Sequence, residues 1–594
     1  MTFFTAYEAV GVNIPIYFIE STAPNNVDDT DQISTDPLPH LQLIPNSDDA
    51  VRQVAADLAK GKHPNLVVMV HGFNNPKPDV LKTYAAAAIA VDGDQAIRSR
   101  EGLVCLGYRW PSEKMGQPRH GTWDAMPTLP TWILYLGAIL AIVPFVFFYF
   151  APDSPWAFDV LRFLRNIIAD HLVTMIGLTL AGLVLTAALL RVIVYFRDNY
   201  RASNYGVPDL IQIIRAIDRE VMKLRSGAGA PIHHDVQLSF IGHSMGGFVV
   251  TNTIRTLSDV FSTPVDALNE FGVAGPTPAP HLQRIGNVFK LKRFVLVSPD
   301  IPAEALLSNR GNFLASALSR FEEAYLFSNE GDEVLRQIST LANYFVFPTK
   351  NRKHGFRLGN VAILSSNFGL IDPARAGGFL RTLRVGDLTL QELYDSLDQA
   401  ESRRQPNEKR RVRAQISLPE VFTYFDRTDY VDQDESGEKR SLLTFANWQK
   451  RYNRSAKMRF YSHLRLLFAY LLPGHRPNVH GGYFEGMLSQ QLIYRLGCLG
   501  FEETVAAYGS EPVLGKQCES KQIRVLLSPC LHKPRTGPAA ALTRYVKTSR
   551  SPTACGAPSR GSRVRKARLA RAPDGSRDCL AARPLHSRRR ERRE

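Results

Sequence analysis

Apolar and polar positions follow two different periods on either side of residue 244. Before it, Val236, Leu238 and Phe240 alternate with other residues and share one face, as a strand requires. After it, apolar residues recur at the spacing of a helix, at Val249, Val250, Ile254, Leu257 and Phe261. The pattern predicts a strand that reverses directly into a helix.

The reversal contains the sequence Gly242-His-Ser-Met-Gly246. Glycine on both sides of Ser244 lets the strand and helix backbones approach each other, while the serine occupies a strained turn with its hydroxyl exposed. This arrangement is typical of a nucleophile in acyl transfer, and the alternative interpretation is a tight structural turn. The flanking strand and helix favour the nucleophile.

A second turn follows another apolar run. Residues 65–70 (NLVVMV) predict a buried strand that ends in His71-Gly72-Phe73. Acyl transfer needs two main-chain N–H groups already in place for the developing oxyanion. We expect one from Met245, just after the serine, and the other from Phe73. Taken alone, His71-Gly72 is equally compatible with an ordinary strand end.

Together with Tyr108-Arg-Trp-Pro-Ser112, which follows a further apolar run, these two turns resemble the α/β-hydrolase superfamily. The likeness is greatest to its poorly characterised bacterial serine hydrolases and covers about residues 10–500, interrupted by insertions. The resemblance implies an α/β fold, with a mostly parallel sheet flanked by helices. It also implies a Ser-Asp-His triad in that chain order, but no particular substrate.

A serine hydroxyl needs a histidine base and a carboxylate that orients this base. In the resembled family the acid usually follows a late strand and precedes an apolar pair. Asp332 fits, since it follows the run at 323–328 and precedes Val334 and Leu335. Asp300, at the end of the run at 292–300, is the alternative, although an Asp-x-Pro sequence also shapes turns.

For the base we favour His480, which lies beside two glycines and resembles the ending of the family's histidine loop. His354, His463 and His475 are the alternatives. The long separation between Asp332 and His480 requires an added segment between about residues 370 and 460. A strand at 420–426 is expected to be the last of the sheet.

Two long apolar runs interrupt the chain, at 132–151 and 172–190, and neither contains a charged residue. Each is close to the ~20 apolar residues that cross a bilayer core. With Trp132, Tyr149 and Tyr195 near their ends, they predict a transmembrane helical hairpin. The alternative is a hydrophobic lid. Basic residues on the enzyme side place the hydrolase domain in the cytoplasm of a two-pass protein of the bacterial inner membrane.

The chain then resumes as an amphipathic helix, with Pro208 in its first turn. Its apolar residues form one stripe, made of Leu210, Ile213, Ile214, Ile217, Val221 and Leu224. The hairpin is therefore expected to interrupt a connection between strands without breaking the core.

The net charge of +16 is located in the C-terminal part of the chain, where residues 516–594 hold 21 Lys or Arg against 5 Asp or Glu. This part is rich in Arg, Ala, Pro, Gly and Ser and predicts a disordered basic tail. The tail suits an anionic partner, or it is a translation of DNA in the wrong frame from about residue 510. We expect no specific nucleic-acid partner. Four of the 6 cysteines lie here, and no cysteine spacing predicts a metal site.

These observations predict a membrane-anchored serine hydrolase that cleaves a carboxylic ester, with lipid-derived substrates suggested by the hairpin. Its catalytic residues are Ser244, Asp332 and His480, and no metal or organic cofactor is needed. An inactive membrane-tethered binding protein and an acyltransferase are the alternatives. The expected divisions are 10–125 (first part of the core), 128–196 (hairpin), 197–370 (elbow and acid), 371–460 (added segment), 461–510 (histidine) and 511–594 (tail).

Overall fold

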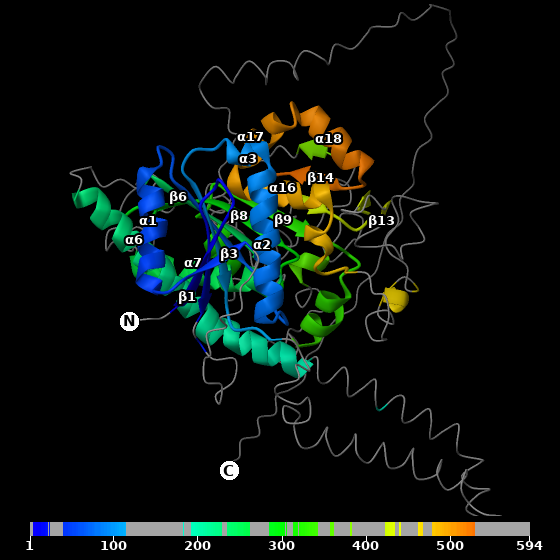
Figure 1. Ribbon diagram of the computed structural model, residues 1–594. Helices are drawn as coiled ribbons and strands as arrows, with labels where there is room; N and C mark the ends of the chain where they lie inside the picture. The colour runs from blue at the N-terminus through cyan, green and yellow to red at the C-terminus, as the bar shows by residue number, and fades with distance from the viewer. Residues whose placement is uncertain are drawn as a thin grey trace, which may run out of the picture. The chain divides into compact units, whose positions relative to one another are not determined.

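The computed structural model describes residues 4–21, 40–113, 192–227, 235–261, 284–302, 313–318, 320–342, 357–361, 380–382, 422–433, 439–440, 463–466 and 478–528, with the single residues 23, 182, 305 and 461. All of them belong to the unit formed by residues 1–533 (Figure 1).

One large sheet organises these residues, with 12 strands and the order β10-β14-β11-β9-β8-β6-β4-β5-β2-β1-β3, while β7 pairs with β8. In chain order the strands are β1 (Phe4–Ala9), β2 (Ile16–Ser21), β3 (Leu41–Ile44), β4 (Asn65–Val70), β5 (Leu103–Arg109), β6 (Val236–His243), β7 (Arg284–Ile285), β8 (Phe289–Val297), β9 (Glu323–Ser328), β10 (Leu380–Thr382), β11 (Thr423–Asp426) and β14 (Arg524–Leu527). A separate antiparallel pair consists of β12 (Asp432–Gln433) and β13 (Lys439–Arg440).

The centre of the sheet is parallel, from β2 through β5, β4, β6, β8 and β9 to β11. Antiparallel pairs occur toward the edges, where β1 pairs with β2 and β14 with β11. Every residue of β4 and β5 is buried, as expected for parallel strands covered on both faces, which read as continuous apolar runs. The predicted α/β class is confirmed.

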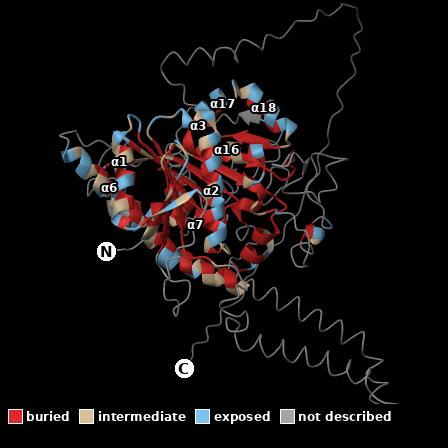
Figure 2. Ribbon diagram, in the orientation of Figure 1, coloured by how far each residue is buried: buried red, intermediate tan, exposed pale blue. Residues whose placement is uncertain are grey.

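Helices cover both faces of the sheet (Figures 1 and 2). The core on one face includes α1 (Ser47–Lys60), α6 (Val207–Gly227), α7 (Met245–Phe261) and α10 (Phe313–Leu318). The core on the other face includes α2 (Lys77–Gly93), α3 (Gln95–Arg98), α16 (Met487–Cys498), α17 (Phe501–Ala507) and α18 (Glu511–Ser520). Short helical turns are η1 (Ala202–Gly206), η3 (Val334–Ser339), η4 (Leu358–Asn360) and η7 (Gly482–Phe484).

Helix α6 illustrates how the apolar pattern determines packing. Five of the six stripe residues, from Leu210 to Val221, are buried against the sheet. Leu224 is 42% exposed, so the stripe ends one turn earlier than the sequence predicts.

The connections on either side of β4 and β6 run in opposite directions. After β4 the chain crosses to β5 on one side, whereas after β6 it crosses to β8 on the other. Because β4 and β6 are adjacent and parallel, their carboxyl ends lie together at the point where the strand order reverses. Open α/β sheets bind ligands in the crevice at such a point. The two turns at His71 and Ser244 both lie there.

The ordered fold continues past residue 510, where the sequence analysis began the disordered tail. Helix α18 buries Leu514 and Cys518, and β14 adds Val525, Leu526 and Leu527 to the sheet. The predicted disorder is therefore wrong for residues 511–528, while the change of reading frame stays a prediction. Strand β11 is not the last strand either, because β14 follows it. A four-residue strand beside a basic segment is too short to stand out by pattern.

The apolar run at 132–151 and, apart from Gly182, the run at 172–190 lie outside the described residues, and so does the tail beyond residue 528. Within the described part of the chain, no helix has the length and apolar character needed to cross a bilayer.

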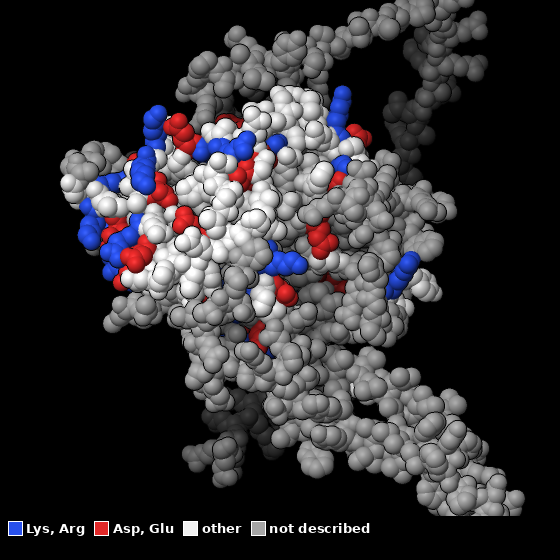
Figure 3. Space-filling view, viewed as in Figure 1, with Lys and Arg blue, Asp and Glu red and all other residues white. Residues whose placement is uncertain are grey.

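On the face shown in Figure 3, Lys and Arg side chains are interspersed with Asp and Glu and form no large patch of one sign.

Candidate active site

Ser244 lies in the sharp turn between β6 and α7. Its backbone has a φ of 54°, in the left-handed region that costs a non-glycine residue about 1–2 kcal/mol. A Cβ at Gly246 would lie 2.3 Å from the carbonyl oxygen of Val70, and one at Gly242 would lie 2.7 Å from the Cα of Gly247. Only glycine fits at both positions, so the strained turn depends on them.

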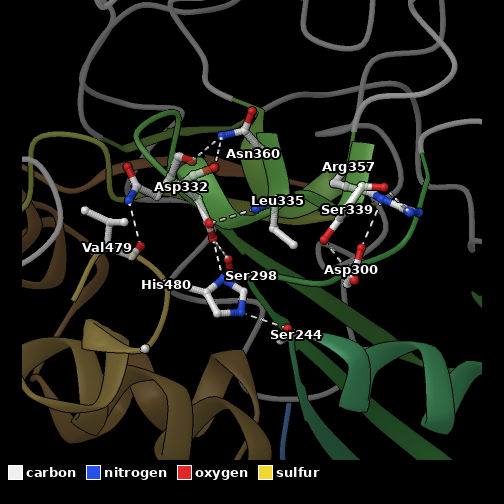
Figure 4. A network of polar contacts seen from close by, with 12 residues as sticks. Ser244, Ser298, Asp300, Asp332, Leu335, Ser339, Arg357, Asn360, Val479 and His480 are labelled. Carbon is white, nitrogen blue, oxygen red and sulfur yellow. Dashed lines mark hydrogen bonds and ion pairs between the residues drawn. The ribbon is translucent and has the colours of Figure 1, made fainter. Parts of the chain in front are cut away.

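A chain of hydrogen bonds joins three residues that are far apart in sequence (Figure 4). His480 Nε2 lies 2.8 Å from Ser244 Oγ, and His480 Nδ1 lies 2.7 Å from Asp332 Oδ2. Since an ionised carboxylate only accepts hydrogen bonds, Nδ1 carries the proton and Nε2 is free to accept one from the serine hydroxyl. The arrangement is that of an activated nucleophile, its base and the group that orients the base.

Asp332 is fully buried after β9 and held from several sides. Ser298 Oγ donates to Asp332 Oδ2 at 2.6 Å, and the Leu335 N–H donates to Oδ1 at 3.1 Å. The Asn360 amide donates to three main-chain oxygens of this loop, including that of Asp332 at 3.1 Å. These bonds to both oxygens keep the carboxylate pointing at His480.

The loop of His480 precedes η7 and is tied to its surroundings through its main chain. Asn329 Nδ2 donates to the Val479 oxygen at 3.0 Å, and His243 Nε2 donates to the His480 oxygen at 3.0 Å. Burial lowers the pKa of His243 to about 4, so this histidine is neutral.

Burial also opposes protonation of His480, but the charge of Asp332 and its hydrogen bond outweigh this effect. The pKa of His480 is therefore raised above its ordinary value. A histidine whose pKa is raised is a stronger base toward the proton of a serine hydroxyl.

The turn after β4 lies directly against the serine. A Cβ at Gly72 would lie 2.7 Å from Ser244 Cβ, so the backbone of this turn passes beside the serine. The N–H of Phe73 follows, and Met245 is the first residue of α7, where N–H groups have no partner within the helix. Both predicted donors thus belong to segments adjacent to Ser244.

His71 is a structural member of this turn. Its ring stacks on Trp110 with centroids 5.2 Å apart, and its Nε2 accepts a hydrogen bond from the Trp110 N–H at 3.2 Å. Trp110 Nε1 donates to the His71 oxygen at 2.9 Å. Burial lowers the pKa of His71 to about 3, which keeps the ring neutral. The Arg-Trp-Pro-Ser motif after β5 therefore packs against the turn of Phe73.

The alternative acid and base lie elsewhere. Asp300 Oδ1 is 3.0 Å from Arg357 Nε, and Asp300 Oδ2 accepts from Ser339 Oγ at 3.2 Å, so this carboxylate belongs to a separate buried pair. His463 Nδ1 is 2.7 Å from Glu333 Oε1. His354 and His475 lie outside the described residues.

Several residues around the triad carry no signal in the sequence. Ser298, His243 and Asn360 are common residue types at strand ends or in loops, and only the fold brings them to Asp332 and His480. Ser298 also has a left-handed φ of 45° at the end of β8. The rule that parallel strands end at one edge of the sheet is the only indication of its place.

No family model matches the chain, and neither a curated protein nor a solved structure matches it significantly. Among the described residues, no three His, Cys, Asp or Glu side chains gather as they would to bind a metal ion.

Proposed function

We propose that this protein is a serine hydrolase that cleaves a carboxylic ester through Ser244, His480 and Asp332. The observation that carries the proposal is the unbroken hydrogen-bonded chain from Ser244 Oγ through the imidazole to Asp332 Oδ2. The strained φ of Ser244 supports it, because strain of this kind in a buried turn persists where function requires it.

In the first half of the reaction, Ser244 Oγ attacks the ester carbonyl and forms a carbon–oxygen bond. His480 Nε2 takes the hydroxyl proton, and Asp332 stabilises the imidazolium that results. The carbonyl oxygen becomes an oxyanion, which the N–H groups of Phe73 and Met245 bind. When the tetrahedral intermediate collapses, the bond to the leaving alcohol breaks and His480 donates its proton to that oxygen.

In the second half, water replaces the alcohol. His480 takes a proton from water as it attacks the acyl-enzyme, and the same two N–H groups bind the second oxyanion. Collapse returns the proton to Ser244 Oγ and releases the carboxylic acid. Each oxyanion donor is worth about 10²–10³-fold in kcat.

A fluorophosphonate probe tests the proposal, because it reacts only with an activated serine. The wild-type protein should be labelled at Ser244 and should hydrolyse p-nitrophenyl esters, and Ser244→Ala should lose both properties. Ser203→Ala is a matched control, since Ser203 is exposed and its hydroxyl donates to the Asn199 oxygen at 2.9 Å. Labelling that persists in Ser244→Ala refutes the assignment.

We also infer that residues 132–151 and 172–190 anchor the protein in a membrane with the hydrolase on the cytoplasmic side. Each run is long and apolar enough to cross a bilayer. The chain also leaves and re-enters the fold at one place, because Arg197 Nη2 donates to the main-chain oxygen of Glu113 at 2.5 Å. The anchor favours lipid-derived esters as substrates.

Alkaline extraction of membranes tests the anchor. Wild-type protein should stay with the membrane, whereas a variant with a short Gly/Ser linker in place of residues 114–191 should be released and still hydrolyse soluble esters. Wild-type protein in the released fraction would contradict the anchor but not the hydrolase.

A further inference from the structure

The turn that carries Phe73 is held from outside by two residues of other segments. Asn74 has a left-handed φ of 58°, and its N–H donates to Asp198 Oδ2 at 2.8 Å. The next N–H, of Asn75, donates to Ser112 Oγ at 3.1 Å, and the Ser112 hydroxyl donates in turn to Asp198 Oδ2 at 3.0 Å. The Asp198 carboxylate thus binds the Asn74 N–H directly and the Asn75 N–H through the Ser112 hydroxyl.

The carboxylate of Asp198 is itself fixed. Its side chain is fully buried, and Arg197 Nε donates to the other oxygen, Oδ1, at 3.0 Å. Arg201 Nη1 lies 3.8 Å from the same oxygen. Oδ1 is therefore occupied by guanidinium groups while Oδ2 faces the turn, and a charged acceptor makes stronger bonds to N–H groups than a neutral one.

The inner side of the turn is closed by Asn75, whose Nδ2 donates to the oxygens of Gly72 and Phe73 at 3.1 Å each. These bonds orient the peptide groups on both sides of Phe73. Asn74 adopts the left-handed conformation, which asparagine tolerates better than most residues, and its bond to Asp198 holds the main chain in this conformation. The Phe73 N–H belongs to the Gly72–Phe73 peptide, whose oxygen accepts from Asn75 Nδ2. Without the bonds to Asp198 and Ser112, Asn74 and Asn75 are free to shift, and the peptide that Asn75 Nδ2 holds shifts with them.

We propose that Asp198 and Ser112 are positioning residues that aim the Phe73 N–H at the developing oxyanion. This inference rests on the proposed hydrolase function and adds two residues to it. Neither touches the reacting atoms, so their loss should weaken transition-state binding while ground-state binding of the ester stays nearly the same.

The test uses the full-length protein, p-nitrophenyl butyrate as substrate and a trifluoromethyl ketone as a reversible inhibitor that forms an oxyanion. Asp198→Leu should lower kcat about 10- to 100-fold, because a displacement of about 1 Å at the reacting centre has an effect of that size. KM should change less than threefold, and inhibitor affinity should fall by the same factor as kcat/KM. Asp198→Asn keeps an oxygen for the Asn74 N–H and should recover part of the loss, and Ser112→Ala should lower kcat about 10-fold.

Asp218→Asn is the matched control. Asp218 is another buried aspartate that binds successive N–H groups of a turn, those of Asn287 at 2.9 Å and Val288 at 3.0 Å, beside Gly286 with a φ of 61°. This turn precedes β8, whereas Ser244 lies beside its far end, about 30 Å away along the strand. Asp218→Asn should lower the melting temperature but keep kcat within twofold.

The outcomes separate the two proposals. If the wild-type protein neither hydrolyses esters nor reacts with the fluorophosphonate, the proposed hydrolase function is refuted. An active wild-type protein whose Asp198→Leu and Ser112→Ala variants keep kcat and inhibitor affinity overturns only the positioning role. If Asp198→Leu does not fold, the same comparison is made with Ser112→Ala and Asp198→Asn. A loss of inhibitor affinity with little change in KM supports the positioning role, and unchanged inhibitor affinity overturns it.

Discussion

Substitution of Gly72 by alanine is the most direct perturbation of the geometry around Ser244. The added Cβ would lie 2.7 Å from Ser244 Cβ and 3.2 Å from both Ser244 Oγ and His243 Nδ1. It adds a single methyl group and removes no hydrogen-bonding group. Its effect therefore measures how closely the turn of Phe73 must approach the nucleophile.

The distances determine the expected magnitude. Non-bonded carbon atoms rest about 3.5–4.0 Å apart, so the turn and the serine must separate by about 1 Å. A displacement of this size at a reacting centre costs about 100-fold in rate, or close to 3 kcal/mol in activation free energy. Overpacking of a close-packed region should also lower the free energy of unfolding by about 1–3 kcal/mol.

The assay compares kcat for p-nitrophenyl butyrate with urea unfolding, measured for wild-type protein, Gly72→Ala and Gly93→Ala. Gly93 ends helix α2, and a Cβ there meets no atom within 4 Å, so its alanine variant should match the wild type in both measurements. A folded Gly72→Ala variant with wild-type kcat would falsify the close approach, and with it the placement of the Phe73 N–H at the oxyanion.

Three further predictions concern His480 and the C-terminal strand. Because the pKa of His480 is raised, kcat/KM should increase with pH through an apparent pKa above about 6.5. Asp332→Asn should lower this apparent pKa and reduce kcat on the order of 10⁴-fold. A pH profile that the substitution leaves unchanged would contradict the pairing of His480 with Asp332. The same pair should contribute to folding stability below about pH 6.5 and lose this contribution as the pH rises through the folded-state pKa, which pH-dependent unfolding measures. A protein truncated after Ser528 should fold and unfold cooperatively on heating. A protein truncated after residue 510 loses the three buried apolar side chains of β14, each of which contributes about 1.5–3 kcal/mol to the free energy of unfolding. It should therefore show no cooperative thermal transition.

Local patterns in the sequence were sufficient for the central strands and for the turn at Ser244. Strands β4 and β6 are apolar enough to be recognised alone, and the glycines at 242 and 246 have a steric reason that no distant residue changes. The helical stripe of α6 was likewise predicted from spacing, except for its exposed end at Leu224. Such features depend on residues within a few positions of each other.

Short elements whose stability depends on distant partners were not predictable in this way. Residues 511–528 form a helix and a four-residue strand only because β11 offers a free edge and α16 an apolar face nearby. Residues 511–528 hold three Lys or Arg against two Glu, but the charge was counted over residues 516–594 together, and this count assigned them to the tail. A strand of this length has too few positions for a period to be visible.

For the candidate active site, the sequence singled out Ser244 as the expected nucleophile and reduced the acid and the base to a few candidates, because each strand end has its own local signal. It favoured Asp332 over Asp300 only through the resemblance to the family, because both residues follow buried strands. The tertiary structure places Asp332 beside His480 and pairs Asp300 with Arg357, and it brings Asp198 and Ser112 to the turn of Phe73. These contacts join residues between 37 and 148 positions apart and depend on which strands are neighbours, and that is a property of the whole sheet rather than of any segment.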